Sequence, residues 1–318
     1  MSVHRRRASL CACVIAFCAG SALATDVAVS PPATGARLIA SPDGLARVAI
    51  WRTAAQGGGT TEVFAFQRTG QVWSEPRALD GRIMLRFGVF DPLGKAPALP
   101  AGLSQPATGD GAYIVQVHGQ LLPEFLADIR SLSAGEPAFL PHAAVIVQLS
   151  DAARATLATR PYVRALARYQ PAYKLDESLL VERLGWNPVS QRAAKPSIDP
   201  AATEPYYVMA LGRGLSVRGP LAKQIEALGG VVESNLDDPG YRLIARLNAA
   251  QLAAVAALPS VHFIDRWSPA EEDMDEQRIF GGANYVEGLT GFSGEGVRAE
   301  VMDGGIRTTH SAYNPRPI

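Results

Sequence analysis

The chain has 318 residues, of which 47% are apolar and 19% are charged. This composition is typical of globular protein with packed cores and argues against a disordered chain. Lysine plus arginine and aspartate plus glutamate number 30 each, so no basic surplus indicates a nucleic-acid-binding protein.

The first 24 residues have the pattern of a secretory signal peptide. A basic start at 5–7 precedes an apolar stretch at 10–19, and Ala22-Leu23-Ala24 offers small residues for cleavage. We therefore expect an exported protein, periplasmic or extracellular, with no membrane association after cleavage. All the cysteines (Cys11, Cys13 and Cys18) lie in this segment, so the mature chain is predicted to contain no disulfide.

A β-rich module and linker are predicted over 25–106. Apolar residues that alternate or run together predict strands at 46–51, 61–67 and 83–89. A glycine turn at 56–59 separates the first two strands, and a proline- and glycine-rich connector follows at 91–111.

The middle of the chain contains an internal repeat. Ala144–Ser150 matches Arg242–Asn248, and the same offset aligns Pro161 with Pro259. Two upstream pairs of segments also match, 112–117 with 206–211 and 123–132 with 220–228. The chain therefore holds two copies of one supersecondary unit.

Each copy predicts the same order of elements. A strand leads to a helix that begins at Pro123 or Pro220, a favourable first-turn residue. A weak strand and a strong strand follow, and Ser150 or Asn248 then caps a second, alanine-rich helix. A last strand completes the order β-α-β-β-α-β, which is that of ferredoxin-like domains.

We therefore predict an α+β fold class with tandem ferredoxin-like domains, each an antiparallel sheet with helices on one face. The first repeat spans 107–180 and the second repeat spans 206–270. Residues 181–205, which are rich in X-Pro pairs, are predicted to form a linker.

Residues 271–318 are predicted to hold a maturation linker and the start of another domain. The acidic run at 271–276 is either a solvated tether or an exposed site for proteolytic maturation. Downstream, a Gly294-Glu295-Gly296-Val297 turn leads into a short strand that ends at Asp303, which two glycines follow.

This region resembles the subtilisin-like serine proteases, or subtilases. The resemblance rests on Tyr-Ile-Val-Gln-Val at 113–117, on 161–175 and 258–265, and on Val-Met-Asp-Gly-Gly-Ile at 301–306. It implies that the repeats are propeptide domains, which help the protease to fold and inhibit it. It also implies that Asp303 is the triad aspartate, which orients the catalytic histidine. The sequence departs from the family in having two such domains, and Gly304 where a threonine or serine is usual.

The resemblance also implies partners and an inhibitory tail. The second repeat is the better candidate for the direct inhibitor, and its tail would begin with Arg266, Trp267, Ser268 and Pro269. The partner would be a subtilase catalytic domain in cis or in trans, and peptides or proteins are the substrates of the full-length family. No cofactor is evident, and a calcium site is implied by the resemblance alone.

The family supplies the triad histidine and serine from His-Gly-Thr and Gly-Thr-Ser motifs. Neither motif occurs in the sequence, so the catalytic partners of Asp303 are absent. The resemblance places His310 in a surface loop after the strand that ends at Asp303. We expect a truncated precursor of a subtilisin-like endopeptidase that is proteolytically inactive as written. A stand-alone secreted subtilase inhibitor is the alternative, and a tandem structural protein without a protease partner is a third reading.

Overall fold

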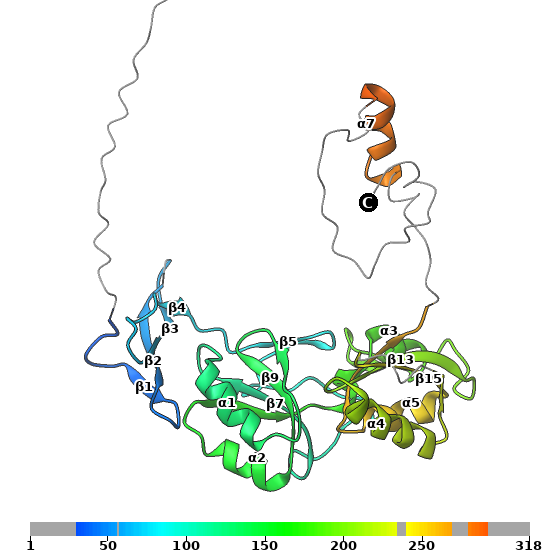
Figure 1. The fold of residues 1–318 in the computed structure, drawn as a ribbon, viewed down its shortest axis with the longest axis horizontal. Coiled ribbons are helices and arrows are strands. Elements are labelled where there is room, and N and C mark those ends of the chain that lie inside the picture. The colour runs from blue at the N-terminus through cyan, green and yellow to red at the C-terminus, as the bar shows by residue number, and fades with distance from the viewer. Residues whose placement is uncertain (1–29, 56, 234–239, 269–278, 292–318) are drawn as a thin grey trace, which may run out of the picture. The chain divides into compact units, whose positions relative to one another are not determined.

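The computed structural model describes residues 30–55, 57–233, 240–268 and 279–291 (Figure 1). The chain divides into two compact units, Met1–Trp267 and Ser268–Ile318. It is a mixed α+β protein with several small antiparallel sheets. Across the described ranges, no helix has both the length and the apolar character needed to span a bilayer.

The N-terminal sheet has strand order β1-β2-β3-β4, with β1 at Arg37–Ala40, β2 at Ala46–Ala54, β3 at Thr60–Arg68 and β4 at Arg77–Ala78. The predicted strands at 46–51 and 61–67 correspond to β2 and β3. The predicted strand at 83–89 is instead a hairpin of β5 (Ile83–Leu85) and β6 (Gly88–Phe90). The chain reverses there with a φ of 155° at Gly88, a conformation that favours glycine.

The first repeat contains six elements: β7 (Gly111–Val117), α1 (Pro123–Leu132), β8 (Ala138–Leu140), β9 (Ala144–Leu149), α2 (Asp151–Ala158) and β10 (Val163–Arg168). Its sheet has strand order β10-β7-β9-β8 and is antiparallel throughout. The first strand of the repeat therefore lies between its third and fourth strands.

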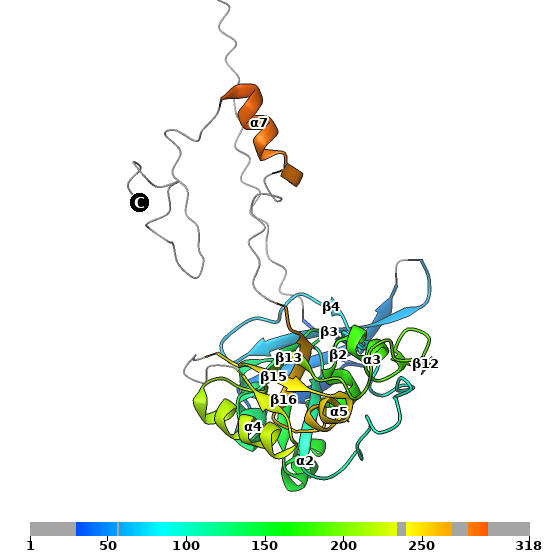
Figure 2. The ribbon, with the colours of Figure 1, turned by 90° about the vertical axis from the view of Figure 1, so that its right-hand side faces the viewer.

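The second repeat has the same order of elements: β13 (Glu204–Ala210), α4 (Leu215–Ala227), β14 (Val231–Val232), β15 (Arg242–Leu247), α5 (Ala249–Ala256) and β16 (Val261–Arg266). Its sheet order, β14-β15-β13-β16, again places the first strand between the third and fourth. Figure 2 shows α4 and α5 on the same side of this sheet.

Helix starts follow the local sequence closely, with one exception. The Ser150 hydroxyl accepts a hydrogen bond from Ala153 N, and Asn248 forms a reciprocal capping box with Gln251, which confirms both predicted N-caps. We predicted that this helix begins at Pro220, but α4 begins at Leu215 and contains the proline. The side chain of Arg218 is fully buried, so tertiary packing organises the turn before the proline.

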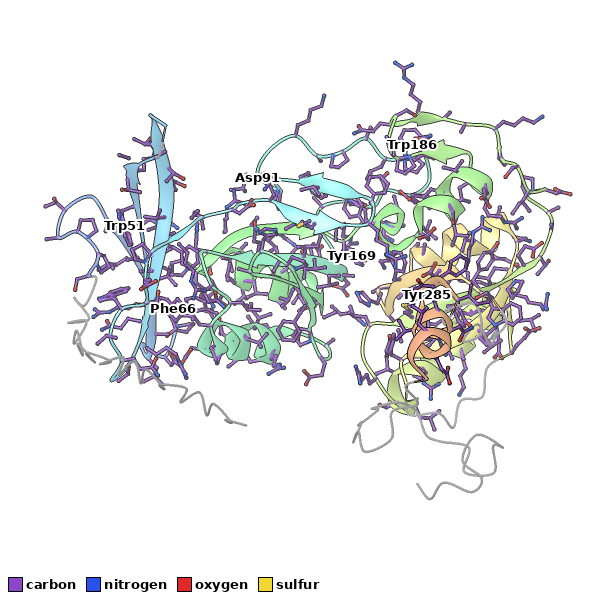
Figure 3. All side chains as sticks on the ribbon, turned by 90° about the horizontal axis from the view of Figure 1, so that it is seen from above. Trp51, Phe66, Asp91, Tyr169, Trp186 and Tyr285 are labelled. Atoms are coloured by element: carbon purple, nitrogen blue, oxygen red, sulfur yellow. The ribbon has the colours of Figure 1, made fainter. Side chains whose placement is uncertain are left out.

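Further regular structure lies at the end of the first repeat and in the predicted linker. A short 3-10 helix η1 (Pro171–Lys174) and α3 (Glu177–Glu182) come first, and a hairpin of β11 (Trp186–Asn187) and β12 (Arg192–Ala193) lies within the predicted linker 181–205 (Trp186 is labelled in Figure 3). Leu179 and Leu180 of α3 are at most 2% exposed. Burial of these leucines stabilises α3 just before the predicted linker, whose prolines all follow the helix.

Two buried clusters organise the unit that ends at Trp267. One cluster joins α1, α2 and one face of the first-repeat sheet to the N-terminal sheet. The other cluster joins the opposite face of that sheet to the β5-β6 hairpin, η1, α3 and the helix-covered face of the second-repeat sheet. The two repeats therefore share a core. In the second unit, α7 (Ala283–Thr290) is flanked by left-handed glycines, Gly282 and Gly291.

Candidate functional site

The described part of the predicted inhibitory tail leaves the second repeat at the end of β16. Arg266 is the last residue of that strand, and Trp267 and Ser268 follow it with exposed side chains. The Arg266 guanidinium forms an ion pair with Glu182 and donates a hydrogen bond from Nε to Ser178 Oγ at 2.9 Å. Helix α3 thus fixes the point where the tail begins. Pro269 and Asp303 lie outside the described residues.

One face of the second-repeat sheet is only partly buried. The strand register puts Tyr207 and Met209 of β13 opposite Ile244 and Arg242 of β15, and opposite Asp265 and Phe263 of β16. None of these six residues is fully buried, whereas their strand neighbours Val208, Leu243 and Ile264 are 0% exposed. We call this set the second-repeat face: Tyr207, Met209, Arg242, Ile244, Phe263 and Asp265.

The second-repeat face has an apolar and aromatic centre with charges of both signs around it. The Arg242 guanidinium lies 4.5 Å from the centroid of the Tyr207 ring, a cation-π contact. Beside the face, Arg246 donates from Nε to Glu233 Oε1 at 2.5 Å. Aromatic and arginine side chains that are at least partly exposed, as these are, are enriched in protein-protein interfaces.

Arg86, in the turn of the β5-β6 hairpin, borders this face. Its Nη1 lies 3.0 Å from Asp176 Oδ2 and 3.5 Å from Asp265 Oδ2, and its guanidinium is 5.1 Å from the centroid of the Phe263 ring. Burial works to raise the pKa of Asp176, but hydrogen bonds from Ser178 and Arg86 outweigh it, so that pKa is lower than usual. Asp176 therefore stays ionised, and Arg86 bridges it to Asp265 of the second repeat.

The corresponding face of the first repeat is covered. The side chains on this face alternate along β7 and β9 with those that contact α1 and α2. They are nevertheless at most 2% exposed: Ala112, Ile114, Ala144 and Ile146. Their cluster includes Ile83 and Phe87 of the hairpin segment and Leu103 of the connector. We call residues 80–91 the cover segment. The two repeats thus differ in which sheet faces a partner can reach.

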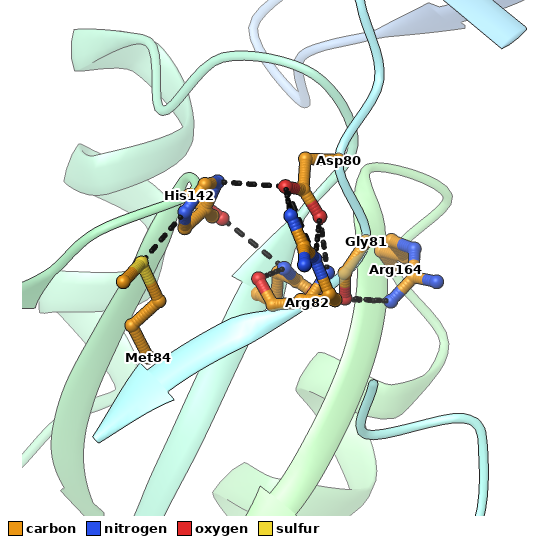
Figure 4. A network of polar contacts seen from close by, with 7 residues as sticks. Asp80, Gly81, Arg82, Met84, His142 and Arg164 are labelled. Atoms are coloured by element: carbon orange, nitrogen blue, oxygen red, sulfur yellow. Dashed lines mark hydrogen bonds and ion pairs between the residues drawn. The ribbon is translucent and has the colours of Figure 1, made fainter. Parts of the chain in front are cut away.

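A polar network fastens the cover segment to the first-repeat sheet (Figure 4). Gln116, which is 1% exposed, donates from Nε2 to Arg82 O at 3.3 Å and to His142 O at 3.1 Å. Arg164 of β10 donates to Gly81 O at 2.9 Å and to Gln116 Oε1 at 2.8 Å, and it pairs with Asp91 at 2.7 Å. Buried polar groups on the sheet are thereby paired with groups of the cover segment.

The same network includes a histidine beside a carboxylate. His142 Nδ1 lies 3.7 Å from Asp80 Oδ2, and His142 Nε2 lies 3.1 Å from Met84 Sδ. Hydrogen bonds from Arg82 hold the pKa of Asp80 well below its usual range. The residues that line the adjoining cavity of about 520 Å³ include no serine, threonine or cysteine side chain that could serve as a nucleophile for this pair.

Among the residues that the structure describes, no three histidine, cysteine, aspartate or glutamate side chains cluster in a way that would hold a metal ion. The calcium site that the resemblance implies stays a prediction.

Sequence reasoning missed the cover segment, although a signal was present. Strand β9 reads Ala-Val-Ile-Val-Gln-Leu, whereas the matching β15 reads Arg-Leu-Ile-Ala-Arg-Leu. A continuous apolar run is typical of a strand buried on both faces, and alternation is typical of a strand with one exposed face. The difference between two matched strands therefore indicates which copy is covered.

No family model, no curated protein and no solved structure matches the chain.

Proposed function

We propose that this chain carries the propeptide of an exported subtilisin-like serine endopeptidase. In this proposal the two repeats are ferredoxin-like domains that assist the folding of the catalytic domain and inhibit it. The second repeat makes the direct contact, and the first repeat and the N-terminal sheet support it.

The second-repeat face is the observation that carries this proposal. A propeptide domain needs a sheet face that is available to the catalytic domain, and only one of the two repeats leaves such a face partly exposed within the described residues. The matching face of the first repeat is already packed against the cover segment. The recurrence of one strand order in both repeats supports the ferredoxin-like assignment.

The start of the predicted tail supports the same surface. Strand β16 contributes Phe263 and Asp265 to the second-repeat face, ends at Arg266 and leads directly into Trp267 and Ser268. A chain that leaves a docking surface at its edge can continue into the neighbouring substrate cleft of the partner. Inhibition would then combine a broad sheet contact with an extended tail, as two linked contacts that reinforce each other.

The test is a titration of the mature chain, residues 25–318, against an active secreted subtilase that hydrolyses a peptide substrate. We expect tight inhibition by the wild-type chain. Ile244→Glu places a charge at the centre of the second-repeat face and should weaken inhibition at least about tenfold, as loss of an interface hot spot does. Thermal unfolding of the variant checks that its fold is intact.

Leu38→Glu is the matched control, because Leu38 is an apolar strand residue that is 60% exposed on β1, away from this face. It should inhibit as the wild type does. Equal inhibition by the two variants would argue against the second-repeat face, and a complete lack of inhibition by the wild-type chain would overturn the proposal.

A further inference from the structure

Two side chains that can bind a metal ion meet where the cover segment packs on the first repeat (Figure 4). His142 Nε2, from the turn between β8 and β9, lies 3.1 Å from the Sδ atom of Met84 on β5. Met84 is 46% exposed and the side chain of His142 is 28% exposed, so both side chains are open to solvent. The contact joins residues 58 positions apart and therefore depends on the packing of the cover segment.

A carboxylate on the other side of the imidazole ring sets its protonation. Asp80 accepts hydrogen bonds from Arg82 Nε at 3.0 Å and from Arg82 Nη2 at 2.7 Å, which keeps it ionised. Its Oδ2 lies 3.7 Å from His142 Nδ1 and attracts the single ring proton of a neutral histidine to that nitrogen. The lone pair of Nε2 then faces the thioether sulfur, which has no proton to donate. Histidines that bind metal ions commonly have such a carboxylate behind the ring.

The backbone holds the histidine in a strained conformation. His142 and Ala143 have φ values of 60° and 57°, in the left-handed region that residues with side chains rarely adopt. Two hydrogen bonds fix this turn on the first-repeat sheet: Gln116 Nε2 donates to His142 O at 3.1 Å, and Val117 N donates to Ala143 O at 2.9 Å. Strained residues cluster at ligand sites, where the surrounding structure orients a side chain in advance.

We propose that His142 and Met84 bind a soft monovalent metal ion such as Cu⁺. Imidazole nitrogen and thioether sulfur are ligands for this class of ion, whereas Ca²⁺ and Mg²⁺ prefer oxygen ligands. With bonds of about 2.0 Å to nitrogen and about 2.3 Å to sulfur, the separation of 3.1 Å corresponds to an angle of about 90° at the ion. The flexible methionine side chain can widen this angle without a change in the backbone.

The surrounding groups disfavour a divalent ion. The negative charge of Asp80 is already paired with Arg82, and Arg77 adds a positive charge to the lining of the adjoining cavity. These arginines repel a monovalent ion less than a divalent one. Zinc sites take three or four ligands from histidine, cysteine, aspartate and glutamate, and the described part of the chain brings no three of these together.

The ion would link the cover segment to the first repeat. Met84 belongs to β5 and His142 follows β8, so an ion bound by both adds a link to those that Gln116 and Arg164 make. An ion that binds only the folded chain stabilises it. We therefore expect the ion to raise the melting temperature and to slow amide exchange in β5 and β6.

The test uses residues 25–318, which include every described residue and none of the three cysteines, so no thiolate competes. The probe is Ag⁺ in a chloride-free buffer, because it takes the same soft ligands as Cu⁺ and needs no reductant. We expect saturable binding by calorimetry and a shift of the Met84 methyl ¹³C resonance at one equivalent, with no shift at Met209. Zn²⁺ and Ca²⁺ should bind at least about tenfold more weakly.

Three variants make the result specific. Met84→Leu removes the sulfur and keeps a similar apolar volume, and it should weaken Ag⁺ binding at least about tenfold. His142→Asn should do the same, and asparagine tolerates the left-handed conformation at this position. Met209→Leu is the matched control, because Met209 is a half-buried methionine of the second-repeat face. It should bind Ag⁺ as the wild type does, and thermal unfolding without the ion checks the fold of each variant.

The ¹⁵N chemical shifts of the His142 ring test the protonation directly. We expect Nδ1 to carry the proton before Ag⁺ is added, and the Nε2 resonance to shift on binding. A ring protonated at Nε2 would show that its contact with Met84 is a hydrogen bond, and would overturn the proposal. Unchanged Ag⁺ binding by Met84→Leu, or Zn²⁺ binding as tight as that of Ag⁺, would overturn it as well. No protease takes part in these measurements, so the proposal stands or falls separately from the proposed function.

Discussion

Lys174 is a buried cation at the junction of the two repeats. It is 1% exposed, its Nζ donates to Leu258 O at 2.6 Å, and it lies 5.7 Å from the centroid of the Tyr169 ring. Burial lowers the pKa of this lysine to about 7, and the positive charge of Arg168 lowers it further. The side chain thus joins η1 of one repeat to the end of α5 in the other at an electrostatic cost.

Stability should therefore rise with pH above 7. In the unfolded chain the lysine pKa returns to about 10.4, so between these values the unfolded state binds more protons than the folded state. The free energy of unfolding then increases by up to about 1.4 kcal/mol per pH unit in that window. The measurement is urea unfolding at several pH values between about 8 and about 9, above the titration of histidines and below the ionisation of tyrosines in the unfolded chain.

Lys174→Met is the matched variant, because it keeps the side-chain length and removes the charge. This substitution should remove most of the increase in the free energy of unfolding with pH. His262 is buried near Lys174 and its pKa is also lowered by burial, but its contribution is nearly complete by about pH 8, because the pKa of an unfolded histidine is about 6.5. If the free energy of unfolding of the wild-type chain did not change with pH in this window, the Lys174 ammonium group would be solvated in the folded state.

At the scale of elements, the cover segment should depend on Gly81. A Cβ at this position would lie 2.2 Å from Arg164 Nη2 and 2.6 Å from Arg164 Cζ. Gly81→Ala would therefore displace Arg164 from Gly81 O, Gln116 and Asp91. We expect a loss of about 1–3 kcal/mol in the free energy of unfolding and faster amide exchange in β5 and β6.

Gly94→Ala is the control in the same connector, because its nearest neighbour would be Asp91 O at an ordinary 3.4 Å. It should change neither the unfolding free energy nor the exchange rates of the hairpin. If the two variants behaved alike, the Arg164 network would not be what holds the cover segment in place.

The elements differ in how far they could be predicted from sequence. The capped helices at Ser150 and Asn248 and the strands of both repeats follow from local residues, because caps and periodicity act within a few positions. The hairpin at 83–90 and helix α3 could not be predicted in this way, since burial against distant parts of the chain decides their structure. The second-repeat face is visible only after the register assigns alternate residues to opposite sides of the sheet.

At the scale of the whole molecule, the shared core predicts that the two repeats unfold together. Tyr169 and Tyr173 of the first repeat lie in one buried cluster with Val208, Ile225 and Ile264 of the second. Neither repeat can lose its structure without exposing apolar surface of the other. Thermal unfolding should therefore be a single transition in both repeats.

Amide exchange during that transition provides the measurement, with probes in β7 and β9 for the first repeat and in β13 and β15 for the second. Tyr173→Ala, which removes a buried ring 5.1 Å from the Phe87 centroid, should lower the stability of both repeats together. Separate midpoints for the two sheets in the wild-type chain would contradict the shared core.

The segment after η1 also seals an edge of the second-repeat sheet. Leu175 forms a parallel bridge with Ile264, and Asp176 N donates to Ile264 O at 3.1 Å, so the outer side of β16 is paired within the chain. The opposite edge strand, β14, has only two residues. Free strand edges are templates for intermolecular β-pairing and aggregation. A substitution that releases Leu175 would expose apolar core and a strand edge at once, so damage at this junction favours insoluble assemblies over a soluble unfolded chain.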